Sequence, residues 1–181
     1  MILTDNEEIA FKCRSLRNLC FQSTRRFIHE DLGWNYRMTN LQAALGVAQL
    51  ERIDEFIARK REIAEKYNEK LKGLPNMEFP LSRTEYAQNI YWVYGIVMKQ
   101  EEEVARIRKS LKQKGIGTRP FFWCMHEQPV LRRMGLFRQE WYPVAEKLAR
   151  CGFYIPSGLG LKNEEIEFVA KSLTEAVLKP V

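Results

Sequence analysis

Asn35 and Arg37 are the side chains of this sequence that are best suited to hold an anion. They stand two residues apart in a polar loop, and a helix is predicted to begin directly after it. Thr39 or Asn40 can cap that helix, and Gln42 follows Thr39 at the spacing of a capping box. An amide and a guanidinium beside a helix N-terminus are donors that suit a phosphate or a carboxylate. A turn residue at Asn35 and a surface ion pair at Arg37 are the alternatives.

His29, His126 and Arg119 are the other candidates for contact with a substrate. The two histidines are the only ones in the chain, and an imidazole can exchange protons near neutral pH. Each of them could instead be a hydrogen-bonded structural residue. Arg119 precedes Pro120, and it could either pair with a substrate carboxylate or brace the end of a strand.

An aromatic run, Phe121, Phe122 and Trp123, follows shortly after this arginine. We interpret these three residues as packing, because aromatic residues beside a strand usually belong to a hydrophobic core. Stacking on a nucleotide base is the alternative interpretation.

Common catalytic and metal-binding motifs are absent from the sequence. It contains no Gly-rich phosphate loop, no H-E-x-x-H helix and no G-x-S-x-G nucleophile elbow. The four cysteines, Cys13, Cys20, Cys124 and Cys151, form no C-x-x-C pair and have no histidine at ligand spacing, so we expect no metal site. With no signal sequence or long apolar span in view, we expect free thiols in a cytoplasmic protein.

The net charge of +6 would allow acidic partners, including nucleic acid, a membrane surface or a phosphorylated small molecule. The 29 basic residues are scattered among 23 acidic ones, which argues against a nucleic-acid-binding stripe. We therefore expect neither nucleic acid nor a membrane as a partner. A basic nucleic-acid-binding module that uses Arg14, Arg17, Arg25 and Arg26 remains an outside alternative.

The secondary structure that must position the candidate residues differs between the two parts of the chain. The first part is expected to contain a short strand at residues 2–3, a helix capped by Asp5 or Asn6 and running to about residue 20, a loop over residues 22–38, and a helix over residues 40–72 that bends near Asp54. That loop carries more polar chemistry than a connection requires, which is typical of a functional loop.

The second part of the chain alternates between strands and helices. Strands or extended segments are predicted at residues 77–79, 91–98, 118–122 and 154–156. Helices are predicted at residues 101–114, 129–134, 142–150 and 164–177. The pattern predicts an α/β (α+β) fold in which helices cover a small sheet.

Four segments of the sequence resemble segments of a known family, in the same order. They are residues 1–17 (M-I-L-T-D-N-E-E-I-A-F-K-C-R-S-L-R), 29–46 (H-E-D-L-G-W-N-Y-R-M-T-N-L-Q-A-A-L-G), 118–126 (T-R-P-F-F-W-C-M-H) and 153–157 (F-Y-I-P-S). Together they are similar to the pyridoxal-phosphate sugar aminotransferases of the DegT/StrS family, perosamine synthases among them. The third segment departs from the family pattern, which usually has Pro-Leu where this chain has Cys124 and Met125.

The resemblance implies the C-terminal half of an aminotransferase of fold type I. Residues 1–38 would be a remnant of the large cofactor-binding domain with its active-site loop, and residues 39–181 would be a linking helix and the small C-terminal domain. Family members carry their Schiff-base lysine shortly upstream of the position of Met1, so no lysine of this chain matches it. We therefore expect the chain to be a fragment or a natural truncation that is inactive alone.

The resemblance also implies a cofactor, pyridoxal phosphate, and a homodimer with sites shared across the interface. Asn35 would contact the cofactor phosphate of the neighbouring subunit, and Arg37 would face the diphosphate or carboxylate of the substrate. His126 would lie beside the substrate pocket, His29 would line the site, and Arg119 would bind substrate.

Two functions remain open after this comparison. The full enzyme would move an amino group from an amino acid, with glutamate the expected donor, to a keto-sugar nucleotide. The alternative is a non-catalytic truncated relative that acts as a dimeric or regulatory binding protein.

Overall fold

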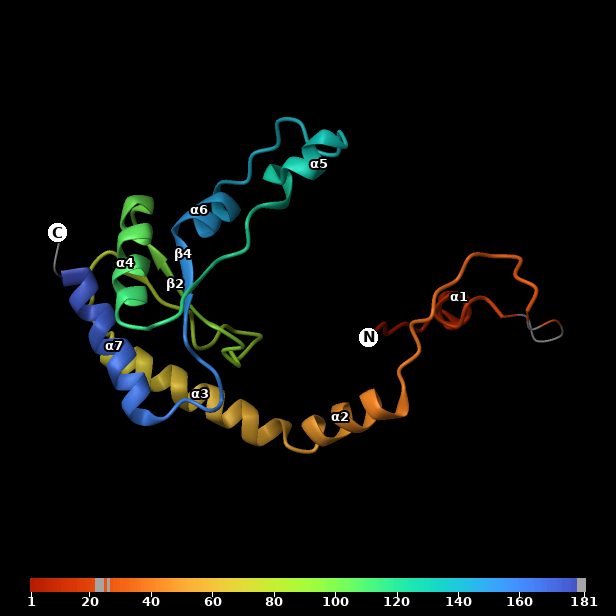
Figure 1. Ribbon diagram of the computed structural model, residues 1–181, viewed down its shortest axis with the longest axis horizontal. Coiled ribbons are helices and arrows are strands. Elements are labelled where there is room, and N and C mark those ends of the chain that lie inside the picture. The colour runs from red at the N-terminus through yellow and green to blue at the C-terminus, as the bar shows by residue number, and fades with distance from the viewer. Residues whose placement is uncertain (22–24, 26, 179–181) are drawn as a thin grey trace. The chain divides into compact units, whose positions relative to one another are not determined.

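The computed structural model describes residues 1–21, 25 and 27–178 of the chain, and it divides into two compact units. The N-terminal unit is Met1–Ile53 and the C-terminal unit is Asp54–Val181 (Figure 1). Residues 22–24 and 26, which belong to the predicted loop and include Arg26, lie outside the described residues.

The N-terminal unit begins with helix α1 (Glu7–Arg17). Of the two predicted caps, Asn6 is the one used, because its Oδ1 accepts the N–H of Ile9 at 3.0 Å. The helix ends three residues earlier than predicted, since Leu19 and Cys20 adopt positive φ angles of 61° and 51° and so cannot continue it. The strand predicted at residues 2–3 is wrong: these residues pair with no strand among the described residues.

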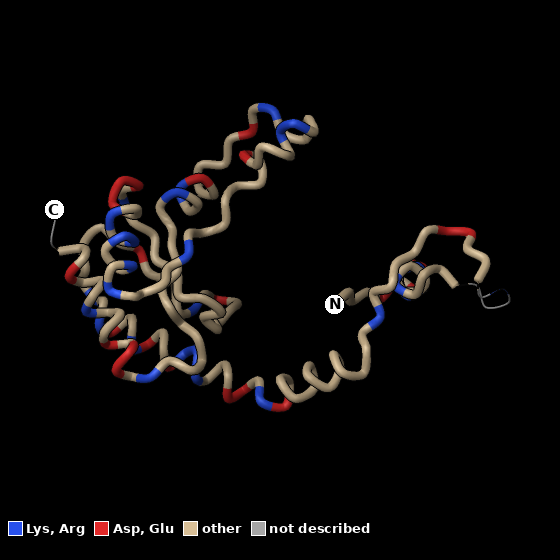
Figure 2. The backbone as a smooth tube through the Cα atoms, viewed as in Figure 1, with Lys and Arg blue, Asp and Glu red and all other residues tan. Residues whose placement is uncertain are grey.

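The long helix predicted over residues 40–72 is two helices, α2 (Asn40–Leu50) and α3 (Ile53–Lys70). The predicted capping box is confirmed: the N–H of Gln42 donates to Thr39 Oγ1, and Gln42 Oε1 accepts the N–H of Thr39. Helix α2 carries no charged residue (Figure 2) and buries none of its side chains. The break between the helices lies just before the bend predicted near Asp54.

Four antiparallel strands form the sheet of the C-terminal unit, in the order β1-β2-β4-β3. Their bounds are β1 (Met77–Glu78), β2 (Tyr94–Met98), β3 (Arg119–Pro120) and β4 (Gly152–Ile155). In the central pair, Ile96 lies opposite Phe153. Strand β2 starts three residues later than predicted, because Tyr91 has a φ angle of 50° that an extended strand does not allow.

The remaining elements of this unit pack around the sheet or extend from it (Figure 1). They are α4 (Glu101–Gln113), the short 3₁₀ helix η1 (Met125–Glu127), α5 (Pro129–Arg133), α6 (Pro143–Cys151) and α7 (Asn163–Leu178). Helices α3 and α7 are joined at their surface, where Lys66 Nζ donates to Asn163 Oδ1 at 2.6 Å and Lys70 pairs with Glu167 at 3.0 Å. The predicted α/β fold, a small sheet covered by helices, is confirmed.

Two tyrosines join helix α3 to the sheet inside the core. The rings of Tyr67 and Tyr94 lie 4.9 Å apart between centroids, and both residues are fully buried. Their hydroxyls donate to the backbone oxygen of Pro156 at 2.8 Å and to Asn68 Oδ1 at 2.6 Å. Burial raises the pKa of both phenols, because the core disfavours the charged phenolate. The pair therefore packs as neutral aromatic groups with satisfied hydroxyls.

Basic and acidic residues are interspersed along both units (Figure 2). Among the described residues, no helix is both long and apolar enough to cross a membrane.

Candidate functional site

The backbone around Asn35 is held against the end of helix α1. Trp34 donates its N–H to the oxygen of Leu16 at 2.7 Å, and its own oxygen accepts the N–H of Leu19 at 3.0 Å. Tyr36 donates its N–H to the oxygen of Arg17 at 2.9 Å. These bonds fix the chain on both sides of Asn35, so its side chain starts from a defined position.

Gly33 makes this close approach possible. A Cβ at position 33 would lie 2.6 Å from the backbone nitrogen of Cys20 and 2.6 Å from the carbonyl carbon of Leu19. Contacts this short with backbone atoms cannot be relieved by a side-chain rotation. The role of this glycine was missed at the level of sequence, where the only signal is a glycine directly before the W-N-Y-R stretch.

The structure brings Asn35 and Arg37 together. Arg37 Nε donates to Asn35 Oδ1 at 3.1 Å, and both side chains are exposed. With the amide oxygen used as an acceptor, the Asn35 NH₂ group and the remaining guanidinium N–H groups are donors beside a positive charge. This donor set is suited to a phosphate or a carboxylate, and its binding of such an anion stays a prediction.

His29 is held by the same turn at the end of α1. Its Nδ1 lies 2.7 Å from the backbone oxygen of Leu19, and its ring lies 5.3 Å from that of Phe21. Because a carbonyl oxygen only accepts, Nδ1 must carry a proton. The backbone oxygen of Leu19 thus binds the His29 imidazole, and the N–H of Leu19 binds the oxygen of Trp34. His29 and the Asn35 loop are therefore both held by the backbone of Leu19.

Arg119 lies in the C-terminal unit, on edge strand β3, where it pairs with Tyr154 of β4. Its exposed guanidinium forms no ion pair with the described residues of the chain. The backbone of Arg119 is therefore fixed by the sheet, while its side chain remains available for a carboxylate.

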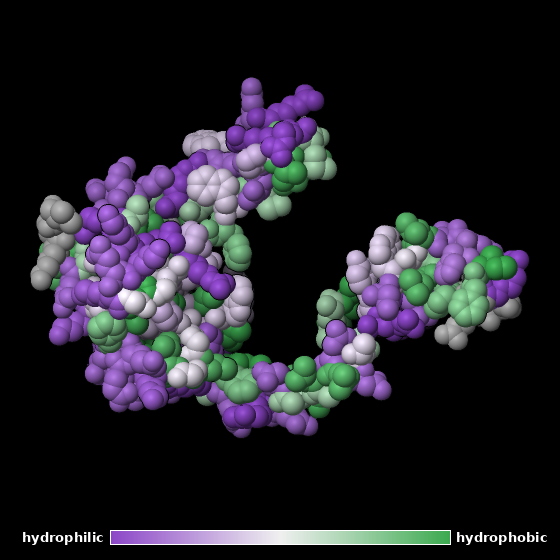
Figure 3. All heavy atoms as spheres, in the orientation of Figure 1, coloured by the Kyte–Doolittle hydropathy of each residue, from purple (hydrophilic) through white to green (hydrophobic). Residues whose placement is uncertain are grey.

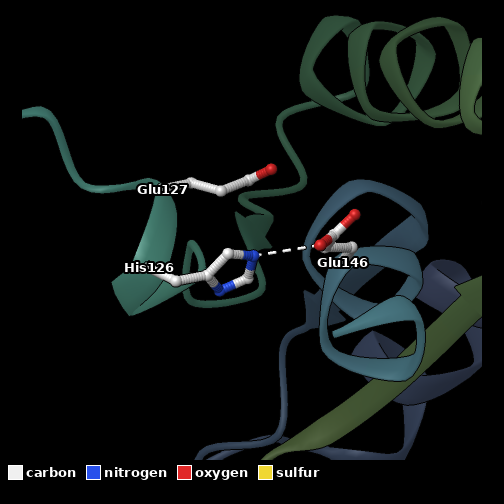
Figure 4. A group of neighbouring side chains, drawn as sticks. All are labelled: His126, Glu127 and Glu146. Atoms are coloured by element: carbon white, nitrogen blue, oxygen red, sulfur yellow. Dashed lines mark hydrogen bonds and ion pairs between the residues drawn. The ribbon is translucent and has the colours of Figure 1, made fainter. Parts of the chain in front are cut away.

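His126, the second histidine, is buried, with 6% of its surface exposed. Its Nε2 lies 3.0 Å from Glu146 Oε1 (Figure 4). Its ring packs edge-on against that of Tyr142, with 4.9 Å between the ring centroids. Arg132 Nε donates to its backbone oxygen at 2.9 Å. These contacts connect η1, α5 and α6, so His126 holds this part of the unit together. Its predicted place beside a substrate pocket stays a prediction.

Glu127, Glu146 and Arg150 complete a polar cluster around this histidine. One ligand atom from each of His126, Glu127 and Glu146 lies within 4.8 Å of the others (Figure 4), a spacing at which side chains can hold a cation. The guanidinium of Arg150 supplies positive charge there, at 2.5 Å from Glu127 and 3.8 Å from Glu146. The cluster was missed at the level of sequence, where the four-residue spacing of Glu146 and Arg150 was the only local signal.

Acidification is expected to loosen this cluster. The N–H of Tyr142, followed by the His126 imidazole, holds the pKa of Glu146 below its ordinary value. Glu146 therefore stabilises the folded state above the ordinary carboxyl pKa, and this contribution disappears as the pH falls through the lowered value. The amide resonance of Tyr142, followed by NMR from pH 7 to pH 2, should report this step. A Glu146→Gln variant should lack it, and identical titrations of the two proteins would contradict the assignment.

Comparison with known proteins identifies the sequence neighbours of this chain. The family model of the DegT/DnrJ/EryC1/StrS aminotransferases matches residues 1–174. The GDP-perosamine synthase of Escherichia coli O157:H7 is 33% identical over 97% of this chain and 46% of its own length. That of Vibrio cholerae is 34% identical over 96% of this chain and 47% of its own length. The chain thus spans about half the length of these relatives.

Solved structures show the same relation. The Streptomyces venezuelae enzyme DesV aligns with a TM-score of 0.82 at 25% identity, over 99% of this chain and 47% of its own. The Helicobacter pylori aminotransferase PseC, which is involved in the biosynthesis of pseudoaminic acid, aligns with a TM-score of 0.84 at 21% identity, over 96% of this chain and 47% of its own. The fold of this chain is that of about half an aminotransferase.

Proposed function

Because this chain belongs to the DegT/DnrJ/EryC1/StrS aminotransferase family, we propose that it supplies the C-terminal half of an enzyme that transfers an amino group to a keto-sugar nucleotide. The match of the family model to residues 1–174 is the observation that carries this proposal. The names of two relatives, both GDP-perosamine synthases at 33% and 34% identity, favour a GDP-linked sugar as the substrate. We propose a keto sugar as the acceptor and glutamate as the donor of the amino group.

The family depends on pyridoxal phosphate, and the exposed donors of the N-terminal unit fit its phosphate. We infer that Asn35 donates to the cofactor phosphate that is bound in the neighbouring subunit of a homodimer. Each active site would then contain residues of both chains. Arg37 would hold the diphosphate or carboxylate of the substrate, and its bond to Asn35 at 3.1 Å would keep the two donors in register. When bound, the cofactor supplies the electron sink for amino transfer.

The other candidates take supporting roles in this proposal. His29 would line the site from its anchor on Leu19. Arg119 would bind a substrate carboxylate from the edge of the sheet. His126 would lie beside the substrate pocket and act by holding η1 against α6, since Glu146 already occupies its Nε2. We further propose that residues 1–38 belong to the large domain of the whole enzyme and residues 39–181 to the linking helix and small domain.

The chain alone is expected to form no stoichiometric covalent adduct with pyridoxal phosphate, because the Schiff-base lysine of the family would lie outside it. Lys60 is the lysine most suited to react with the aldehyde of the cofactor, because burial lowers its pKa and so favours the neutral amine. Its Nζ already donates to the oxygen of Ser157 at 2.6 Å. Absorbance titration with pyridoxal phosphate, borohydride reduction and mass spectrometry would measure the adduct, with Lys60→Arg as the control. A one-to-one adduct on any single lysine, Lys60 included, would contradict the expectation.

A chimera tests the proposed activity directly. The part of the Vibrio cholerae relative that this chain does not cover would be fused to residues 1–181, and amino transfer from glutamate to a GDP-linked keto sugar would be measured. An active chimera supports the proposal. A folded chimera that binds pyridoxal phosphate but transfers no amino group to any nucleotide-linked keto sugar would overturn it.

The exposed face of α2 favours a second candidate function, a non-catalytic protein that works by association. Leu41 and Leu45 of this helix are 81% and 71% exposed, and Figure 3 shows apolar side chains gathered over α2. Such a face is stabilised when another protein surface covers it. Sedimentation of the purified chain, with and without Leu41→Glu and Leu45→Glu, would measure self-association. A dimer that these substitutions dissociate, in a protein whose parent reading frame encodes no upstream lysine, would favour this function.

A further inference from the structure

Trp123 stands apart from its aromatic neighbours in the C-terminal unit. The ring of Phe121 packs at 4.5 Å against that of Tyr154, and it fills the space above Gly152, where a Cβ would lie 2.4 Å from it. The packing interpretation therefore holds for Phe121. Trp123 keeps 47% of its surface exposed, and the neighbouring Phe122 is also exposed. The ring of Phe122 lies edge-on to that of Tyr154 at 6.5 Å, whereas the ring of Trp123 packs on no aromatic ring among the described residues.

The indole of Trp123 is supported from behind by a fixed charge. The guanidinium carbon of Arg150 lies over the ring, 5.2 Å from its centroid. Arg150 is itself held by Glu127 at 2.5 Å and by Glu146 at 3.8 Å. Because the carboxylates hold the guanidinium and the guanidinium covers the ring, little side-chain freedom is left to lose when a ligand stacks on the indole.

We propose that Trp123, backed by Arg150, is a stacking platform for the base of a nucleoside diphosphate. An aromatic ring with an accessible surface binds a base through its π-face, whatever the base. A cation on one side of the indole draws electron density from the other, which reduces the repulsion between the indole and an electron-rich base such as guanine. Arg119 lies four residues upstream on the same segment and forms no ion pair with the described residues. Its guanidinium, proposed above for a substrate carboxylate, would attract the diphosphate of a ligand that carries no carboxylate.

This inference rests on the proposed function and assigns the part of the substrate that the C-terminal unit would recognise. The test is a titration of the chain with GDP, followed by intrinsic fluorescence and by equilibrium dialysis, with inorganic pyrophosphate as a ligand that lacks the base. Trp123→Ala is expected to weaken GDP binding by about 5- to 150-fold, as for loss of one stacked base. Trp123→Phe should restore part of the affinity, and neither change should alter pyrophosphate binding.

Trp92→Ala is the matched control. Trp92 is 69% exposed in the same unit but lies outside the Arg150 cluster, so its loss should leave GDP affinity unchanged. Equal GDP affinity in wild type and Trp123→Ala would overturn the platform while leaving the proposed aminotransferase function intact. Absence of GDP binding to the wild-type chain would also overturn it. The chimera assay decides the proposed function separately, because it measures amino transfer and not base stacking.

Discussion

Replacement of Phe153 by alanine is expected to lower the free energy of unfolding of the C-terminal unit by about 3–5 kcal/mol. Phe153 is fully buried on central strand β4, opposite Ile96 on one side and Pro120 on the other. Truncation removes contacts from both neighbouring strands and leaves a cavity that a sheet held by hydrogen bonds cannot close. Urea unfolding followed by far-UV circular dichroism would measure the loss.

Phe168→Ala is the control for this prediction. Phe168 lies on helix α7 of the same unit and is half exposed, so its truncation should change the free energy of unfolding by no more than about 0.5 kcal/mol. Equal losses in the two variants would mean that the core is not organised around the central strands as described.

Replacement of Gly33 by alanine is expected to detach the Asn35 loop from helix α1. The new Cβ would overlap the backbone of Leu19 and Cys20, and overpacking of this kind costs about 1–3 kcal/mol. If Asn35 and Arg37 bind as proposed, a displacement of about 1 Å should lower amino transfer by the chimera roughly 100-fold. Protease sensitivity of residues 27–38 would report the loop, and the chimera assay would report the activity.

Gly46→Ala provides a matched glycine-to-alanine control. A Cβ at Gly46 meets nothing within 4 Å, and the position lies inside helix α2. Alanine there should favour the helix by up to about 1 kcal/mol and leave the loop and the activity unchanged. If Gly33→Ala behaves like Gly46→Ala in both measurements, the close approach of the loop to α1 is not what positions Asn35.

Local sequence determined the features that depend on neighbours within one or two turns. The capping box at Thr39 follows from two residue types three positions apart, and the structure forms it. For the first helix the sequence indicated a cap at Asp5 or Asn6, and the structure uses Asn6. Helix α4 occupies residues 101–113 of the 101–114 predicted, because its apolar spacing and Gly115 are local signals. The four segments shared with the family also indicated correctly where this chain belongs.

Only the tertiary structure decided how distant segments meet. The strand order β1-β2-β4-β3 pairs segments that are far apart in the sequence. In the N-terminal unit, His29 and Trp34 both bond to Leu19, and Gly33 lies close to the backbone of the same turn. No periodic pattern in the sequence indicates these contacts. His126 shows the difference most clearly: its sequence segment did not indicate its partner, and only folding placed its imidazole against Glu146, 20 positions away. Apolar periodicity identifies the face that an element buries, but the partner of that face depends on contacts between elements far apart in the chain.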